Sequence, residues 1–329
     1  MYTRKLGRSG LEVSALGMGC WAIGGPWTYE YDNAPHPAGW GQIDDAESIR
    51  SIHTALEMGV NFFDTAANYG AGHSEYILGK ALANRRDKVV IATKFGYLVD
   101  EERKWIIKDH DTVLGNIKED CEKSLRRLNT DYIDLYQFHV EDYDPKKAPE
   151  VMEVLESLVA EGKIRWYGWS TDLAGSARVF AKGKHCTSIQ QMINWATSLD
   201  YAPTLQVCEE NGLASIVRGP LSKGFLTGKF NDENYKFSDD DVRFGTDLSS
   251  EQFIKLNKAI DAVRQVLTSG GRTLAQGALA WLWARSESTI PIPGFKTIAQ
   301  VRENAGALEF GPLTPDQMQQ IDEVLGRNP

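Results

Sequence analysis

The chain has 329 residues, of which 42% are hydrophobic and 25% charged, and a formal net charge of −9 at pH 7. This composition is typical of a globular protein with a substantial core, and it argues against long disordered segments. The acidic balance argues against nucleic-acid and anionic-membrane partners, because both bind through an excess of Lys and Arg.

The N-terminus lacks the apolar segment of a signal peptide, and no run reaches the roughly 18 apolar residues that a membrane-spanning helix requires. We therefore expect a cytoplasmic protein with no membrane partner. The four cysteines are scattered without a C-x-x-C motif or a nearby pair of histidines, which argues against a zinc site and a redox motif. We expect no metal site, and mostly buried, reduced thiols at Cys20, Cys121, Cys186 and Cys208.

The chain opens on a predicted β-hairpin, because residues 3–16 place a Gly-Arg-Ser-Gly turn between two short strand-like stretches. Strand-like and helical runs alternate after it. The expected strands are residues 13–20, 60–66, 88–94, 132–139, 164–170, 187–193, 213–219 and 288–294. Between them, residues 44–59, 113–128 and 148–162 show the apolar periodicity of helices.

This alternation predicts the fold class. Nearly continuous apolar runs such as residues 88–94 are typical of strands in a parallel sheet that helices cover. Eight such units favour an α/β fold of the (β/α)8 TIM-barrel type over an open, doubly wound sheet. No Pro-, Gly- or Ser-rich linker interrupts the chain, so we expect residues 1–329 to form a single domain.

Two long loops follow the first and seventh expected strands, at residues 24–42 and 226–244. Both leave the carboxyl ends of strands, where barrel enzymes place their active sites, and loops of this length commonly act as lids or binding walls. Trp21, Trp27 and Trp40 are therefore expected to wall a substrate pocket. An alternative fits the sequence equally well, namely that these rings only pack the first loop onto the barrel.

Four chemically distinct residues lie near the ends of successive expected strands. Asp64, Lys94 and His139 stand at the ends of the second, third and fourth strands, which are neighbours around a barrel rim. Tyr69 lies in the loop that follows Asp64. Taken singly, Asp64 could cap a helix and Lys94 could be a rim lysine or a Schiff-base nucleophile. His139 lacks the second histidine that a metal site would need.

Their combination predicts an acid that protonates a carbonyl oxygen. A free phenol has a pKa of about 10 and is a weak acid at neutral pH. A nearby ammonium stabilises the phenolate and is expected to lower the pKa of Tyr69, while a carboxylate paired with the lysine fixes the ammonium in place. The sequence therefore favours a proton donor at Tyr69, supported by Lys94 and Asp64.

Six motifs, in order and over essentially the whole chain, carry a family resemblance. They are DTAANYG (64–70), TKFG (93–96), DLYQFH (134–139), GKIRWYGWS (162–170), RGPLSKGFLTGK (218–229) and IPGFKTIAQVRENA (292–305). Through them the chain resembles the aldo-keto reductase superfamily. The resemblance implies a (β/α)8 barrel that binds an extended nicotinamide dinucleotide without a Rossmann domain. It also implies that Tyr69 is the general acid in reduction, that Asp64 and Lys94 tune it, and that His139 orients the substrate carbonyl.

The same resemblance implies three groups of cofactor-binding residues. Those at the nicotinamide carboxamide would be Ser170, Thr171, where relatives often have Asn, and Gln190. Those covering the pyrophosphate would be Arg218, where many relatives have an aromatic ring, Gly219, Pro220, Leu221 and Lys223. Those at the adenosine end would be Gly294, Phe295, Lys296, Thr297, Gln300 and Asn304. Because Lys296 and Thr297 at a helix N-terminus suit a 2′-phosphate, we expect NADPH in preference to NADH.

We therefore expect an NADPH-dependent oxidoreductase that reduces a small aldehyde or ketone to an alcohol. A second hypothesis is an NADPH-binding regulatory subunit resembling the channel β subunits, which share this fold and these four residues. A third is a Schiff-base aldolase that uses Lys94 and needs no dinucleotide. The motifs specify neither the substrate nor the oligomeric state.

Overall fold

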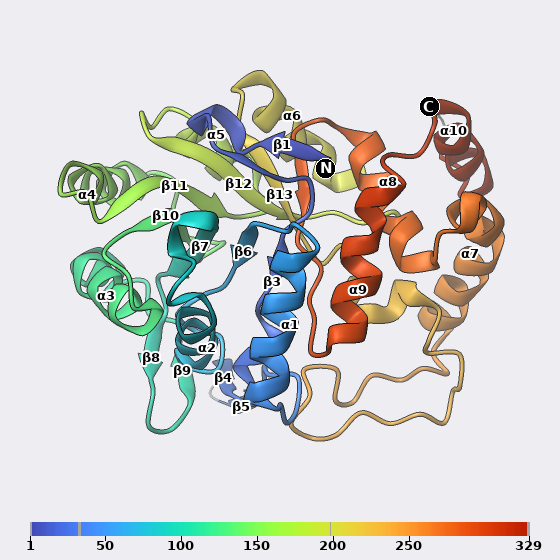
Figure 1. Cartoon of the computed structure of the whole chain (residues 1–329), viewed down its shortest axis with the longest axis horizontal. Helices are drawn as coiled ribbons and strands as arrows, with labels where there is room; N and C mark the ends of the chain where they lie inside the picture. The colour runs from blue at the N-terminus through green and yellow to red at the C-terminus, as the bar shows by residue number, and fades with distance from the viewer. Residues whose placement is uncertain (1, 32–33, 198, 328–329) are drawn as a thin grey trace.

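A parallel sheet of eight strands forms the centre of the molecule, in the order β14-β13-β12-β11-β10-β7-β6-β3 (Figure 1). The computed structural model describes residues 2–31, 34–197 and 199–327. The strands are β3 (Met18–Gly19), β6 (Phe62–Asp64), β7 (Val90–Phe95), β10 (Ile133–Phe138), β11 (Ile164–Ser170), β12 (Cys186–Met192), β13 (Ala214–Arg218) and β14 (Thr289–Pro291). All neighbouring pairs are parallel, as the alternation of strands and helices predicts.

The two edges of this sheet are joined by backbone hydrogen bonds. Gly17 N donates to Pro291 O at 2.9 Å, and Gly19 N donates to Pro293 O at 3.0 Å. The approach is close enough to require glycine, because a Cβ added at Gly19 would lie 2.7 Å from the Ile292 carbonyl oxygen. The sheet therefore curls until its first and last strands meet.

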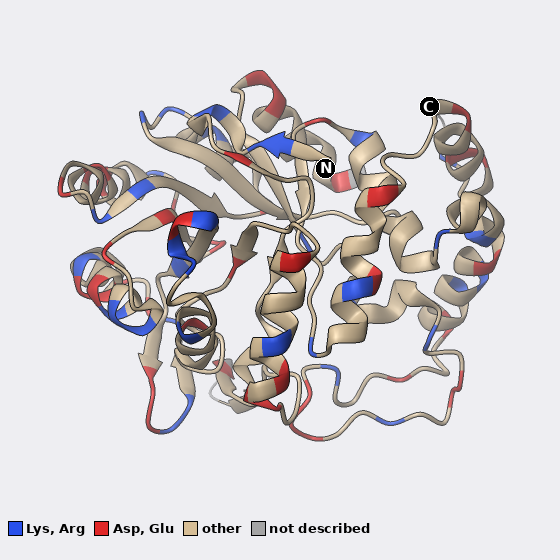
Figure 2. Cartoon of the chain, viewed as in Figure 1, with Lys and Arg blue, Asp and Glu red and all other residues tan. Residues whose placement is uncertain are grey.

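Helices lie outside the sheet, and charged residues of both signs are spread over them and over the loops (Figure 2). They are α1 (Asp45–Glu57), α2 (His73–Leu82), α3 (Val113–Leu128), α4 (Ala148–Ala160), α5 (Ala174–Phe180), α6 (Ala202–Glu210), α7 (Glu251–Leu267), α8 (Leu274–Arg285), α9 (Ile298–Gly306) and α10 (Pro315–Val324). The three predicted helices correspond to α1, α3 and α4. Of the helices in the described ranges, none is both long and apolar enough to cross a membrane.

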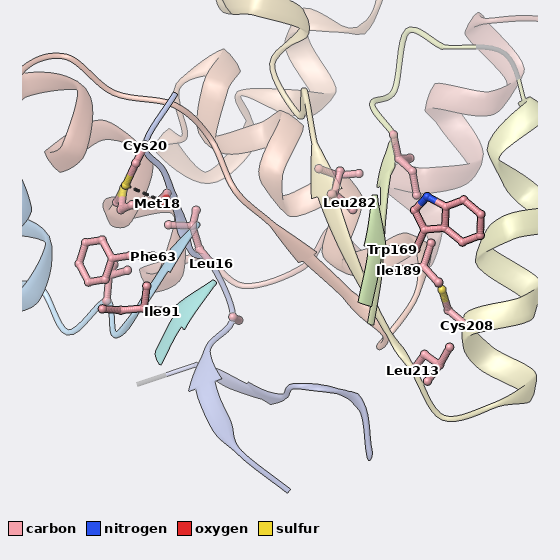
Figure 3. Close-up of a cluster of buried hydrophobic side chains, with 14 of the residues drawn as sticks. Leu16, Met18, Cys20, Phe63, Ile91, Trp169, Ile189, Cys208, Leu213 and Leu282 are labelled. Atoms are coloured by element: carbon pink, nitrogen blue, oxygen red, sulfur yellow. Dashed lines mark hydrogen bonds between the residues drawn. The ribbon is translucent and has the colours of Figure 1, made fainter. Parts of the chain in front are cut away.

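The two faces of the sheet bury different side chains. The outer face packs against the helices through residues such as Phe63, Ile91 and Trp169 (Figure 3). The inner face encloses a smaller apolar cluster that includes Phe62, Ala92, Leu135, Ala214, Ile216 and Ile290. Because side chains alternate between faces along a strand, the inward residues nearest the carboxyl ends lie above this cluster. The four cysteines are unpaired and buried.

The predicted N-terminal hairpin is present, but one expected strand is wrong. β1 (Thr3–Lys5) pairs antiparallel with β2 (Glu12–Ser14), on either side of a short 3-10 turn at Gly7–Ser9. The expected strand 13–20 is therefore divided between β2 and β3. The chain bends at Ala15, whose carbonyl oxygen accepts a hydrogen bond from Trp283 Nε1 at 2.8 Å.

The predicted long loop at 24–42 contains strands that the sequence did not indicate. β4 (Thr28–Tyr31) and β5 (Ala34–Pro37) pair antiparallel, and residues 32–33 between them lie outside the described residues. β4 also pairs in parallel with β9 (Trp105–Ile107), which forms a second hairpin with β8 (Leu98–Asp100). Segments that follow β3 and β7 thus build one small sheet, in the order β5-β4-β9-β8, beside the carboxyl ends of the main strands.

Candidate active site

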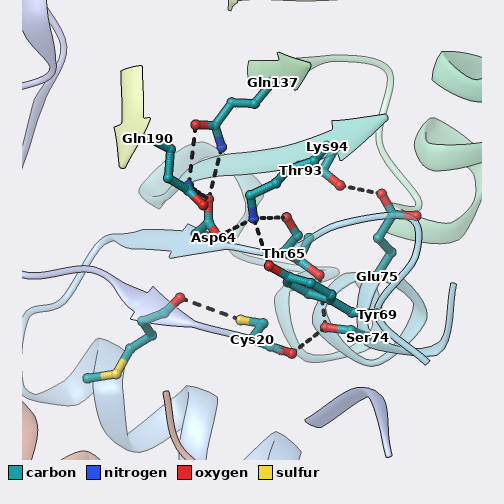
Figure 4. Close-up of polar contacts among 11 residues, drawn as sticks. Cys20, Asp64, Thr65, Tyr69, Ser74, Glu75, Thr93, Lys94, Gln137 and Gln190 are labelled. Atoms are coloured by element: carbon teal, nitrogen blue, oxygen red, sulfur yellow. Dashed lines mark hydrogen bonds and ion pairs between the residues drawn. The ribbon is translucent and has the colours of Figure 1, made fainter. Parts of the chain in front are cut away.

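Three of the four residues expected at the strand ends, Asp64, Tyr69 and Lys94, converge inside the mouth of the main sheet (Figure 4). Asp64 is the last residue of β6, and Lys94 lies near the end of β7, so both side chains point inward from adjacent strands. Lys94 Nζ donates to Asp64 Oδ1 at 2.5 Å, to Thr65 O at 2.9 Å and to Tyr69 Oη at 3.2 Å. Lys94 is fully buried and Asp64 is 1% exposed. The lysine thus links a carboxylate to a phenol.

The surroundings favour a charged Lys94 and a protonated Tyr69 at neutral pH. Burial opposes the charge on Lys94, but Asp64, and then Tyr69, outweigh it and raise its pKa. Burial also raises the pKa of Tyr69, with Lys94 acting in the opposite direction. The expected lowering is therefore wrong for the folded protein, because desolvation exceeds the attraction of the ammonium.

His139, which follows β10, faces the same space. Its ring lies edge-on to Tyr69, with centroids 6.1 Å apart, and edge-on to Tyr97 at 5.4 Å. Burial first, then the positive charges of Lys94 and Arg218, lower the pKa of His139 well below its usual value. The imidazole is therefore neutral at physiological pH, and a neutral imidazole can donate one N–H to a carbonyl oxygen.

Backbone packing fixes the loop that carries Tyr69. Ser74 N, in the first turn of α2, donates to Tyr69 O at 3.2 Å. Gly24 lies so close to this loop that an added Cβ would come within 2.8 Å of Gly70 N. Trp21 stacks on the Tyr69 ring, with centroids 5.9 Å apart and planes 17° from parallel. The phenol is thus held by backbone on one side and by an indole on the other.

Sequence reasoning missed Gln137 of β10. Gln137 Nε2 donates to Asp64 Oδ2 at 2.9 Å, beside Gln190 Nε2, which donates to the same oxygen at 2.8 Å. The signal was available, because Gln137 lies two residues before His139 and so shares its inward face.

The residues expected at the nicotinamide carboxamide lie together at the ends of β11 and β12. Ser170 and Gln190 are paired in register and buried, and Thr171 N donates to Gln190 O at 2.9 Å. In this structure the Gln190 amide is bonded to Asp64.

Arg218, at the end of β13, is engaged in ion pairs. Its guanidinium lies 2.6 Å from Asp172 Oδ2 and 3.4 Å from Glu141 Oε2. These carboxylates follow β11 and β10, so the cluster spans the rim of the sheet. A sequence pattern at Arg218 alone could not indicate either partner, because both are distant along the chain.

The remaining expected cofactor residues follow β13 and β14. Gly219, Pro220, Leu221 and Lys223 form the turn after β13, in which Lys223 has a φ of 55°. After β14, Phe295 is buried in the core and Asn304 Nδ2 donates to Gly294 O at 3.2 Å.

The start of α9, expected to bind a phosphate, already has side-chain partners. Thr297 and Gln300 form a capping box there. The Ile298 backbone N–H donates to Glu47 Oε1 at 3.0 Å. Lys296 Nζ donates to Trp40 O at 2.8 Å. Lys296 thus lies beside the start of α9 as expected, but the Glu47 carboxylate already accepts a hydrogen bond from one backbone N–H of that helix start.

The three tryptophans expected around a substrate have different environments. Trp21 covers Tyr69 and packs edge-on against Trp40, with centroids 5.3 Å apart. Trp27 is 7% exposed and belongs to an apolar cluster with Ile106, Tyr97, Trp21 and Tyr69. Trp21 therefore lies directly against the Tyr69 ring, and Trp27 belongs to the same cluster, so the contacts fit a pocket wall as well as loop packing.

Known proteins resemble this chain over almost its whole length. Residues 15–326 match the family model described as Aldo/keto reductase family. The chain is similar to the uncharacterized oxidoreductase YqkF of Bacillus subtilis strain 168, with 31% identity over 327 residues covering 98% of this chain and 95% of the relative.

Two solved structures resemble the whole chain. Glycerol dehydrogenase AKR11B4 from Gluconobacter oxydans has a TM-score of 0.82 and 29% identity, covering 99% of this chain and 97% of that one. An aldo-keto reductase from Klebsiella pneumoniae, in complex with NADPH, has a TM-score of 0.71 and 25% identity, covering 100% of this chain and 97% of that one.

Proposed function

The chain belongs to the aldo/keto reductase family, and on this premise we propose that it is an NADPH-dependent reductase of a small aldehyde or ketone. The observation that carries the proposal is the buried chain of contacts from Asp64 through Lys94 to the Tyr69 hydroxyl. We further propose that residues 1–329 form one closed (β/α)8 barrel domain, acting in the cytoplasm.

Each of the four residues has a distinct task in this reaction. Bound NADPH would supply the hydride that reaches the carbonyl carbon. Tyr69 donates its proton to the carbonyl oxygen, and the Lys94 ammonium stabilises the phenolate that remains. Asp64 keeps Lys94 in place, and neutral His139 donates a hydrogen bond to the oxygen as negative charge develops on it. In alcohol oxidation the same groups act in reverse.

The residues present suit a nicotinamide dinucleotide phosphate. Buried Ser170 and Gln190 offer a hydroxyl and an amide beside the four residues, where a carboxamide would need them. Lys296 supplies a positive charge at the start of α9, where a phosphate is favoured. Trp21, with Trp40 behind it, would form the apolar wall of the substrate pocket.

Replacing the proton donor tests the proposal. Tyr69→Phe should lower the rate of carbonyl reduction by at least about a hundredfold, because general acid catalysis is lost, while NADPH binding measured by fluorescence stays unchanged. Tyr136→Phe is a matched control, because the buried Tyr136 hydroxyl has no hydrogen-bond partner among the described residues. An unchanged rate in Tyr69→Phe would refute the assignment. Wild-type protein that binds NADPH but reduces no carbonyl would instead favour a regulatory subunit.

A further inference from the structure

We propose that Gln137 is a positioning residue that orients Asp64, and through it Lys94, for proton donation by Tyr69. This inference rests on the proposed function, because it assigns a task to Gln137 within that reaction. Among the described residues, the Gln137 side chain hydrogen-bonds to Asp64 and Gln190.

The Asp64 carboxylate is fully engaged, and each oxygen has a different kind of partner. Oδ1 accepts from Lys94, while Oδ2 accepts from Gln137 at 2.9 Å and from Gln190 at 2.8 Å. Gln137 is fully buried and Gln190 is 1% exposed, so no solvent competes for these bonds. Three donors on two oxygens leave the carboxylate little freedom to rotate.

The strand register brings the two amides to this oxygen. Gln137 on β10 lies directly beside Lys94 on β7 and beside Gly168 on β11. Gln190 lies one strand further on, on β12. The amides approach until Gln190 Nε2, which donates, is 3.3 Å from Gln137 Oε1. Each glutamine therefore also restrains the other (Figure 4).

The two amides differ in whether the proposed function gives them a second binding partner. Gln190 lies next to Ser170, where the proposed function requires a contact to the nicotinamide carboxamide. Gln137 has no such second task, so it is the donor that can hold Oδ2 whether or not the cofactor is bound. An Asp64 carboxylate held in one orientation in turn keeps the Lys94 ammonium directed at the Tyr69 oxygen.

The test removes this amide and keeps the shape of the side chain. Gln137→Met should lower kcat for reduction about 10- to 100-fold, the range expected for losing a hydrogen bond to a charged group. The apparent pKa of the tyrosine in the pH profile of alcohol oxidation should rise, because a less well directed ammonium stabilises phenolate less. Affinity for NADPH in a fluorescence titration should not change.

A control glutamine separates positioning from packing. Gln191 is equally buried, but its amide donates to Ser215 Oγ at 2.8 Å and belongs to the other face of β12. Gln191→Met should leave kcat and the pH profile unchanged. Equal losses of kcat in the two variants, or an unshifted profile in Gln137→Met, would overturn the positioning role.

Two further variants separate a folding defect from the loss of the positioning role, and the positioning role from the proposed function. If Gln137→Met does not fold, Gln137→Glu preserves the shape and donates only while its carboxyl is protonated, so its activity should fall more steeply than that of wild type as pH rises. A wild-type profile would contradict the proposal. Tyr69→Phe, measured in the same series, tests the proposed function separately: if it is inactive while Gln137→Met is normal, only the positioning role fails.

Discussion

Removing the charge of Lys94 should destabilise the protein strongly, because it strands a carboxylate in the interior. Lys94→Met keeps most of the apolar stem but deletes the hydrogen bonds to Asp64, Thr65 and Tyr69. With Asp64 only 1% exposed, solvent cannot replace the lost partner. Breaking a buried ion pair by removing one member costs about 3–5 kcal/mol, and we expect a loss of unfolding free energy in this range.

A double-mutant cycle measures the interaction itself. Asp64→Asn should also destabilise, because it leaves the lysine cation without its carboxylate. The double variant Asp64→Asn/Lys94→Met removes both charges and should cost about 2 kcal/mol less than the sum of the single losses. The loss of unfolding free energy in Lys94→Met, relative to wild type at the same pH, should become smaller in acid, because protonation neutralises the unpaired carboxylate.

Urea denaturation followed by circular dichroism and tryptophan fluorescence provides the free energies, and coincidence of the two signals checks that unfolding is two-state. Additive losses in the cycle would refute the reasoning. A Lys94→Met variant as stable as wild type would also refute it, because the Asp64 carboxylate would then be stabilised by something other than Lys94.

Two further predictions concern pH and cofactor choice. Burial raises the pKa of Asp120 to about 6, so its charge destabilises the fold above that pH and the penalty fades as pH falls toward the ordinary value of an aspartate. Asp120→Asn should therefore raise the melting temperature at about pH 8 and leave it unchanged near pH 4, and an equal gain at both pH values would contradict this. Lys296→Met should weaken NADPH binding far more than NADH binding in a fluorescence titration, because only NADPH carries the 2′-phosphate. Glu47→Gln should act in the opposite direction by removing the carboxylate bonded to α9, and equal losses for both cofactors in Lys296→Met would refute the phosphate role.

The positions of Asp64, Lys94 and His139 could be predicted because each ends or follows an apolar run that the sequence identifies as a β-strand. Gln137 was not predicted, although the sequence contains the signal: side chains alternate along a strand, so Gln137 faces the same side as His139. β4 (Thr28–Tyr31) and β5 (Ala34–Pro37) were missed for a different reason: they are short and rich in aromatic residues or proline, and β4 also pairs with the distant β9.

The electrostatics of the site could not be obtained from sequence. The pKa of Tyr69 depends first on how deeply the side chain is buried and then on the nearby Lys94 ammonium, which comes from another strand. The pairing of Arg218 with Asp172 likewise depends on how far apart the ends of β13 and β11 lie. Local patterns indicate which residue types face the site, whereas their ionisation depends on contacts between segments distant along the chain.

The small sheet β5-β4-β9-β8 bears on how such an enzyme could be re-engineered. Barrel enzymes are often treated as modular, with each loop after a strand exchanged independently to change selectivity. Here the loops after β3 and β7 share hydrogen bonds between β4 and β9. A graft of either loop alone would leave an unpaired strand edge beside the carboxyl ends of the main strands, and exposed edges promote aggregation. These two loops should therefore be transplanted as one unit, taken from a single donor.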